Sequence, residues 1–173
     1  MALKLKKVND EVYYSEQSVV SLSQEDLDSL IGIAETTLRK RVRICYHSSP
    51  LDTVHEMVIV HPKEAYVRPH KHLKKSESMI ILRGSVDYIT FSETGKVTQL
   101  IPMGDINSGE TFFQSTRSET FHTLIIHTEW LVFMEITKGP FLKKDTVFPE
   151  WTLEKPTDEE KKNFFLKIYE ESK

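Results

Sequence analysis

The chain has 173 residues, of which 39% are hydrophobic and 28% charged, and its formal net charge is −3. This length fits one domain with a sizeable core, and the composition is that of an ordinary globular protein. The slight negative charge predicts no general attraction to nucleic acid. A single cysteine, Cys45, excludes an internal disulfide framework and a zinc site made of several thiolates.

No apolar run reaches the roughly 18 residues that span a bilayer. The first ten residues carry lysines without the apolar run that follows in a secretory signal. We therefore expect a cytoplasmic protein with no membrane partner. Basic clusters such as Arg39-Lys40-Arg41 and Lys74-Lys75 are interpreted as solvated surface charge, since such runs usually solvate a face.

The pattern of residues 23–41 predicts an amphipathic helix. Ser23 is a suitable N-cap, and Glu25 and Asp26 fall in the first turn. Apolar residues then recur at helical spacing, namely Leu27, Leu30, Ile31, Ala34 and Leu38. Residues 12–22, ahead of this helix, are expected to form a short strand or an extended arm.

From residue 43 to about residue 141 the pattern changes to short β-branched and apolar runs separated by turn residues. The expected strands are residues 54–60, 79–82, 86–91, 97–101, 111–113, 120–126 and 130–136. Arg83-Gly84-Ser85 and residues 93–96 are interpreted as turns. Seven or more strands without a helical interruption are typical of a sandwich or a closed barrel.

The tail of the chain returns to a helical pattern. Thr157 and Glu160 have the spacing of a capping box, and an apolar stripe follows at Phe164, Phe165, Ile168 and Tyr169. The predicted fold is mainly β, a barrel with an N-terminal and a C-terminal helix. We expect one domain made of an arm and helix (1–42), the barrel (43–141) and a C-terminal extension with a helix (142–173).

The chemistry of the sequence is concentrated in residues 69–77. On a strand, residues i and i+2 point to the same face, so His70 and His72 can direct both imidazoles at one point. Glu77 begins the next expected strand after a short loop, and His122 on a later strand can supply a third imidazole. Three imidazoles and one carboxylate suit a divalent transition metal such as Fe, Mn, Ni or Zn, with positions left open for water or substrate.

The spacing His70-x-His72-x4-Glu77-x6-Gly84 resembles the first motif of the cupin family. That resemblance implies a cupin fold, the double-stranded β-helix or jelly-roll barrel, with a metal held by His70, His72, Glu77 and His122. The second cupin motif is poorly kept. Arg117 and Glu119 stand where the family has proline and glycine, and Ile126 stands in place of its terminal asparagine.

Most of the chain also resembles a narrower group, the WbuC family of cupin-fold metalloproteins. The resemblance is carried, in order, by Arg43-x-Cys45-x-His47, His55-Glu56-Met57, Pro69-His70-Lys71-His72, Lys75-Ser76-Glu77, Phe121-His122-Thr123, Glu135-x-Thr137-x-Gly139-Pro140-Phe141 and Trp151. Proteins of that family are encoded among bacterial O-antigen and other surface-polysaccharide genes. The resemblance therefore implies a setting in polysaccharide biosynthesis but no particular reaction.

Three further residues are candidates for catalysis. Glu135 lies on an otherwise apolar strand, where it can serve as a general base, orient a ligand histidine, or face solvent at the strand end. Arg43 shares one strand face with Cys45 and His47, and this face either lines the interior or looks outward. His55 is either near the metal or a satisfied structural histidine.

Other residues are given simpler interpretations. Cys45 is expected to be a small buried apolar side chain rather than a nucleophile. His127 comes five positions after His122, and this odd spacing places it on the opposite face of a strand. It is therefore expected at the surface. Lys71, Lys74 and Lys75 are interpreted first as solvated loop lysines, with attraction of an anionic substrate as the second interpretation.

The function expected from these observations is that of a metal-dependent enzyme of the isomerase or epimerase type. Its partner would be a small polar substrate, a sugar or a nucleotide sugar, and a homodimer is a further expectation from the fold. Two alternatives stay open: an iron- or nickel-dependent dioxygenase, and a non-catalytic sugar-binding module.

Overall fold

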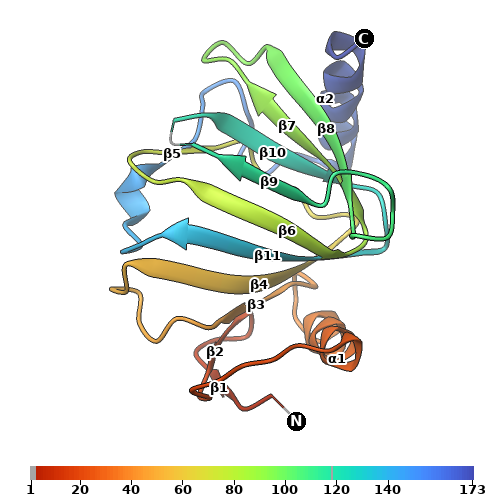
Figure 1. The fold of residues 1–173 in the computed structure, drawn as a ribbon. Helices are drawn as coiled ribbons and strands as arrows, with labels where there is room; N and C mark the ends of the chain where they lie inside the picture. Colours follow the sequence, from red (N-terminus) through yellow and green to blue (C-terminus); the bar gives the residue numbers. More distant parts are fainter. Residues whose placement is uncertain (1–2, 118) are drawn as a thin grey trace.

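The computed structural model describes residues 3–117 and 119–173. Over these residues the chain forms twelve strands and two α-helices (Figure 1). The large sheet runs in the order β1 (Leu5–Lys7), β2 (Val12–Ser15), β3 (Val42–Cys45), β4 (Val54–Pro62), β11 (Trp130–Lys138), β6 (Glu77–Arg83) and β9 (Phe113–Thr116). The small sheet has the order β10 (Phe121–Ile126), β7 (Ser85–Phe91) and β8 (Val97–Gly104).

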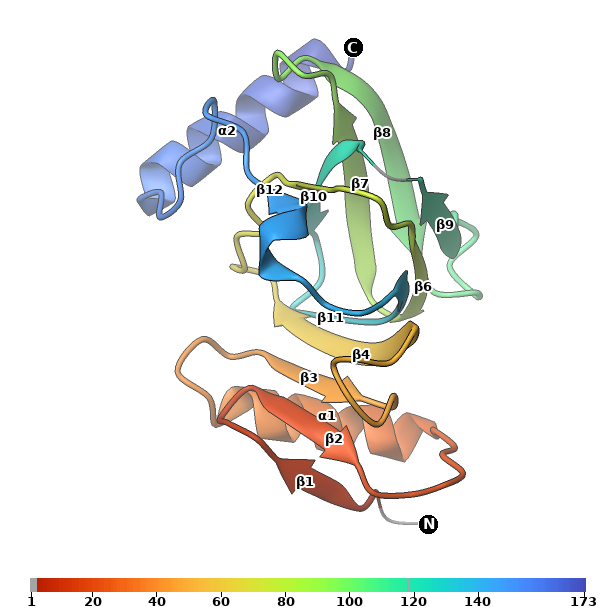
Figure 2. The same ribbon diagram turned by 90° about the vertical axis from the view of Figure 1, so that its left-hand side faces the viewer.

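A third, two-stranded sheet pairs β12 (Thr146–Val147) with β5 (Lys71–His72), and a short 3₁₀ turn at Lys143–Asp145 leads into β12. The large and small sheets curve around a common interior, and β12 lies on the side of it that faces the viewer in Figure 2. Neighbours in the two sheets pair antiparallel except β2 and β3, which run parallel. The architecture is the predicted jelly-roll barrel.

Alternation along the strands divides the apolar residues between the interior and the outer faces. On β4, Met57 and Ile59 point into the barrel, whereas Val58 and Val60 pack beneath α1 (Gln24–Glu35) on the outside. The helix α2 (Asp158–Glu171) covers the outer face of the small sheet, where Ile168 packs with buried residues of β7 and β10. The large and the small sheet therefore each have one face on the barrel interior and one face under a helix.

Both predicted N-caps are confirmed. Ser23 and Asp26 form a capping box at the start of α1, and Thr157 and Glu160 form another at the start of α2. The apolar stripe of α2 also packs against the barrel as expected. Gly84 takes a φ of 93° in the turn between β6 and β7, and a Cβ there would clash with the carbonyl oxygen of Trp130. This turn therefore requires glycine.

Two predicted boundaries were wrong. The first helix ends at Glu35 rather than residue 41, because the hydroxyls of Thr36 and Thr37 donate to helix carbonyls and the chain turns toward β3. Leu38 is consequently 98% exposed and does not join the apolar stripe. The strand expected at residues 111–113 is instead β9, Phe113–Thr116, whose position is set by pairing with the edge of β6.

Residues 12–22 were left open between a short strand and an arm, and Val12–Ser15 forms the strand β2. β2 pairs with β3, and β1, which was not predicted, pairs with β2 and forms one edge of the large sheet. No helix in the described ranges is long and apolar enough to cross a membrane.

Candidate metal centre and its cavity

The four predicted ligands come together at one point of the barrel. His70 and His122 form a two-way backbone bridge, with N···O distances of 3.1 and 2.9 Å, which places their side chains together. His72 lies on β5, and Glu77 opens β6 after a short loop. One donor atom from each of these four side chains lies within 4.8 Å of the other three. The geometric condition for a shared ion is therefore met.

The histidine rings are oriented by hydrogen bonds at Nδ1. Nδ1 of His70 lies 2.8 Å from the carbonyl oxygen of Arg68, and Nδ1 of His122 lies 2.9 Å from that of Thr120. Nδ1 of His72 lies 3.2 Å from the hydroxyl of Thr146. A carbonyl accepts only from Nδ1–H, so the proton on Nδ1 is engaged in His70 and His122, and Nε2 is the ring atom directed at the shared point. Such an arrangement is usual for histidines that bind metals.

The Nε2 atoms of His72 and His122 lie 2.9 and 3.3 Å from the two carboxylate oxygens of Glu77. Burial alone would raise the pKa of the Glu77 carboxyl, but hydrogen bonds from His122 and His72 hold this pKa below its usual range. Burial lowers the pKa of His70 to about 3. The donors are thus a carboxylate and a neutral imidazole, as metal binding requires, and the set of three imidazoles and one carboxylate fits a divalent transition metal.

The metal cluster opens into a cavity of about 660 Å³, which we call the reaction chamber. Its wall includes three of the four ligands and all three predicted catalytic residues, namely His70, His72, Glu77, Arg43, His55 and Glu135. The volume is typical of small-molecule sites. The structure therefore brings together residues as far apart in sequence as Arg43 and Glu135, which are 92 positions apart.

Glu135 lies on the interior face of β11, the face that also carries Leu131 and Phe133. Burial and the nearby Glu77 charge raise the pKa of Glu135 to about 7. The prediction that it can orient a ligand histidine is not realised, because the three Nδ1 atoms contact Arg68, Thr120 and Thr146 instead. The solvent-facing alternative is also excluded, since the side chain lines the chamber.

The face of β3 that carries Arg43, Cys45 and His47 lines the interior. The sequence had left open whether this face points inward or outward. Cys45 is buried in the interior cluster, and burial raises the pKa of its thiol, as expected for an unreactive side chain. His47 stacks on His55, with ring centroids 4.0 Å apart and planes inclined by 1°. His55 is buried, and its Nε2 has no hydrogen-bond partner among the described residues.

The surface residues behave partly as expected. His127 is half-exposed, and its Nε2 lies 2.9 Å from Asp87. Lys74 is exposed, but Lys71 pairs with Glu93 at 2.6 Å, and Lys75 lines the chamber. Arg39 and Lys40 are exposed as expected, and Arg39 and Arg41 also pair with Glu11.

Sequence reasoning missed several residues that line a second cavity, which shares part of its wall with the chamber. Thr146 and Phe148 come from the C-terminal extension, and Arg68, Tyr66 and His61 come from segments flanking the first motif. Arg68 stands two positions before His70, which was the one available signal, since alternate residues of an extended segment share a side. The others carry no local pattern that distinguishes them.

The position of Glu119 explains how the chain tolerates the loss of the second motif's glycine. Its φ is 72°, in the left-handed region that favours glycine. Its backbone N–H donates to the carbonyl of His72 at 2.9 Å. The turn is therefore retained without the glycine, and His122 keeps its place.

Comparisons with known proteins agree with this fold. A family model described as a domain of unknown function (DUF6016) matches residues 22–103, slightly less than half of the chain. No curated protein matches. Among solved structures, the protein SO0799 of Shewanella oneidensis aligns with a TM-score of 0.55 and 11% identity, over 70% of this chain and 82% of that one.

Two further solved structures align less closely. KdgF from Halomonas sp. has a TM-score of 0.47 and 10% identity, over 60% of this chain and 82% of its own. The oxalate decarboxylase of Lactobacillus farciminis has a TM-score of 0.45 and 14% identity, over 56% of this chain and 27% of its own. The chain thus has the cupin fold, with a three-histidine, one-glutamate group that fits a metal ion.

Proposed function

We propose that this cupin is a metal-dependent enzyme that isomerises or epimerises a sugar or nucleotide sugar. The observation that carries the proposal is that three of the four metal ligands and Glu135 line one chamber of about 660 Å³. A divalent metal held by His70, His72, Glu77 and His122 would supply Lewis-acid polarisation of a substrate oxygen.

Glu135 is the residue that we assign to proton transfer. It sits on the wall of the same chamber, and among the described residues no hydrogen bond occupies its carboxylate. A pKa of about 7 lets the group both accept and return a proton near neutral pH. Isomerisation and epimerisation need this reversibility, because a proton removed from carbon is replaced on a carbon.

Arg43 and His55 have supporting roles in the proposal. Arg43 is exposed within the chamber, and its guanidinium can donate to a polar substrate group. His55 lines the chamber and holds a fixed position through its stack on His47, with its Nε2 buried. We propose that both residues orient the substrate rather than move the proton.

The substrate class rests on the resemblance to the WbuC family, which is an association rather than a geometric argument. That resemblance supports a role in bacterial O-antigen or other surface-polysaccharide biosynthesis, with a cytoplasmic location. A homodimer is also proposed. It is supported by the edge strand β1, whose outer side is available for pairing, and light scattering of the purified protein would measure the mass.

Deuterium exchange tests the reaction without knowledge of the product. Metal-loaded protein is incubated in D₂O with a panel of sugar phosphates and nucleotide sugars, and NMR records deuterium on carbon. We expect incorporation into one substrate, and a rate lower by about 10²–10⁴-fold for Glu135→Gln. Glu129→Gln, an exposed site on the β10–β11 turn, is the matched control and should exchange normally.

The alternatives give different results in the same experiment. Oxygen consumption with bound Fe(II), without deuterium incorporation, would favour the dioxygenase. Substrate binding with neither incorporation nor oxygen consumption would favour a sugar-binding module. Equal exchange rates for wild type and Glu135→Gln would remove the assigned role of Glu135.

A further inference from the structure

A second cavity, of about 670 Å³, adjoins the reaction chamber. We call it the basic vestibule, and its wall contains four arginines, Arg39, Arg41, Arg43 and Arg68. Only two carboxylates, Asp10 and Glu11, share this wall. The positive excess is a local property, because the whole chain carries a formal charge of −3.

The four arginines are not equivalent. Glu11 accepts from Arg39 Nε at 2.6 Å and from Arg41 Nε at 2.9 Å, so one carboxylate engages both groups. Asp10 pairs with Lys7 at 2.8 Å. Arg43 and Arg68 have no acidic partner among the described residues. They are the arginines available to a ligand.

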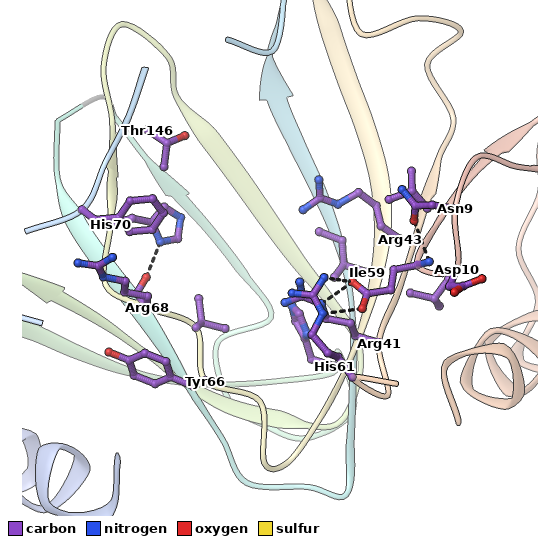
Figure 3. A pocket seen from close by; sticks show the side chains of 16 residues that line it. Asn9, Asp10, Arg41, Arg43, Ile59, His61, Tyr66, Arg68, His70 and Thr146 are labelled. Carbon is purple, nitrogen blue, oxygen red and sulfur yellow. Dashed lines mark hydrogen bonds and ion pairs between the residues drawn. The ribbon is translucent and has the colours of Figure 1, made fainter. Parts of the chain in front are cut away.

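Arg68 is held in place without being neutralised. Its Nε donates to the hydroxyl of Thr152 at 3.1 Å and its Nη2 to the carbonyl of Thr152 at 3.2 Å. Its guanidinium carbon also lies 4.7 Å from the centre of the Phe148 ring. These contacts fix the guanidinium but leave its charge uncompensated. Arg43 and Arg68 lie on opposite sides of the open space (Figure 3).

The vestibule and the reaction chamber share part of their wall. Arg43, His70, Thr146 and Phe148 line both cavities. One elongated molecule can therefore extend from the metal cluster into the vestibule. Arg68 is fixed and Arg43 is accessible. Their guanidinium groups, on facing walls, match the charge of a compact dianion.

We propose that the basic vestibule binds the phosphate or diphosphate group of the substrate, through Arg43 and Arg68. This inference rests on the proposed function, since it assigns the anionic part of the same substrate. It restricts the substrate to phosphorylated sugars and nucleotide sugars, and it excludes free sugars.

Binding of inorganic pyrophosphate to chelator-stripped wild-type protein tests the proposal. Calorimetry at low ionic strength should detect binding, and Arg43→Gln or Arg68→Gln should weaken it by about tenfold or more. Arg117→Gln removes the same charge from an exposed position after β9 and should leave affinity within about twofold. Malonate, a dicarboxylate of similar size, should bind more weakly than pyrophosphate.

Absence of pyrophosphate binding, equal affinity for all variants, or tighter binding of malonate would overturn the assignment. Circular dichroism checks the fold of each variant. If Arg68→Gln fails to fold because Thr152 loses its partner, Arg43→Gln carries the test, since the Arg43 side chain makes no hydrogen bond among the described residues.

The two proposals fail in distinguishable ways. Protein that binds a metal ion but not pyrophosphate would refute only the phosphate site. Protein that binds pyrophosphate through Arg43 and Arg68 but takes up no metal would refute only the metal-dependent enzyme.

Discussion

The metal cluster and the basic vestibule occupy adjoining parts of one interior but differ in how their charged groups are held. At the cluster, four donors lie within 4.8 Å of one another, and hydrogen bonds fix each ring or carboxylate. In the vestibule, charge is spread over four arginines from several segments, and two of them have no acidic partner within residues 3–117 and 119–173. The first arrangement suits a small metal ion. The second suits a larger anion whose negative charge compensates the arginines.

This difference predicts that metal binding by the cluster and anion binding by the vestibule can be lost separately. His122→Ala should reduce metal affinity by more than the roughly 10–100-fold that follows loss of a group bonded to a ligand, because a donor itself is lost. Elemental analysis and the metal-induced rise in Tm would measure this. His127→Ala, at a half-exposed position, is the control and should bind metal normally. Pyrophosphate affinity should not change, and a parallel loss would mean that the two parts are one site.

A second prediction concerns pH and the vestibule wall. Burial, with the charges of Arg41 and Arg43, lowers the pKa of His61 to about 3. The unfolded chain takes up a proton near pH 6.5 that the folded protein excludes, so stability falls as pH decreases from about 6.5 toward 3.

His61→Gln removes this proton uptake. Between pH 7.5 and pH 5, the wild type should lose up to about 2 kcal/mol more unfolding free energy than the variant, in the absence of metal. Urea denaturation at both pH values measures the difference. Parallel losses in the two proteins would show that His61 is protonated in the folded state.

The smallest predicted effect concerns a residue that both cavities share. Thr146 contacts Nδ1 of His72 at 3.2 Å, so Thr146→Val should weaken metal binding by about tenfold. Thr98→Val on the exposed side of β8 is the matched control. Unchanged metal affinity would show that the short β5–β12 pairing alone orients His72.

Much of the site could be predicted from the sequence because its signals are local. His70, His72 and Glu77 lie within eight positions, and strand alternation with one short loop is enough to bring them together. Gly84 and the two capping boxes are also local, since each depends on backbone geometry within a single turn. These predictions needed no knowledge of the rest of the chain.

Long-range packing decided the remaining features. Alternation showed that Glu135 shares a face with Leu131 and Phe133, but only closure of the barrel showed that this face is the interior. Pairing with β6 set the position of β9, and the turn toward β3 ended α1 at Glu35. Periodicity within a segment cannot specify its partners, so these features were open or wrong at the level of sequence.

The sequence by itself determined the strand-rich class, the helix starts and the metal-ligand candidates, because neighbouring residues share one backbone and a fixed side-chain period. The tertiary structure alone decided that Arg43 and Arg68, twenty-five positions apart, face one cavity while Glu11 engages Arg39 and Arg41. Charge compensation depends on distances in space, and those distances follow from how the sheets close around the interior.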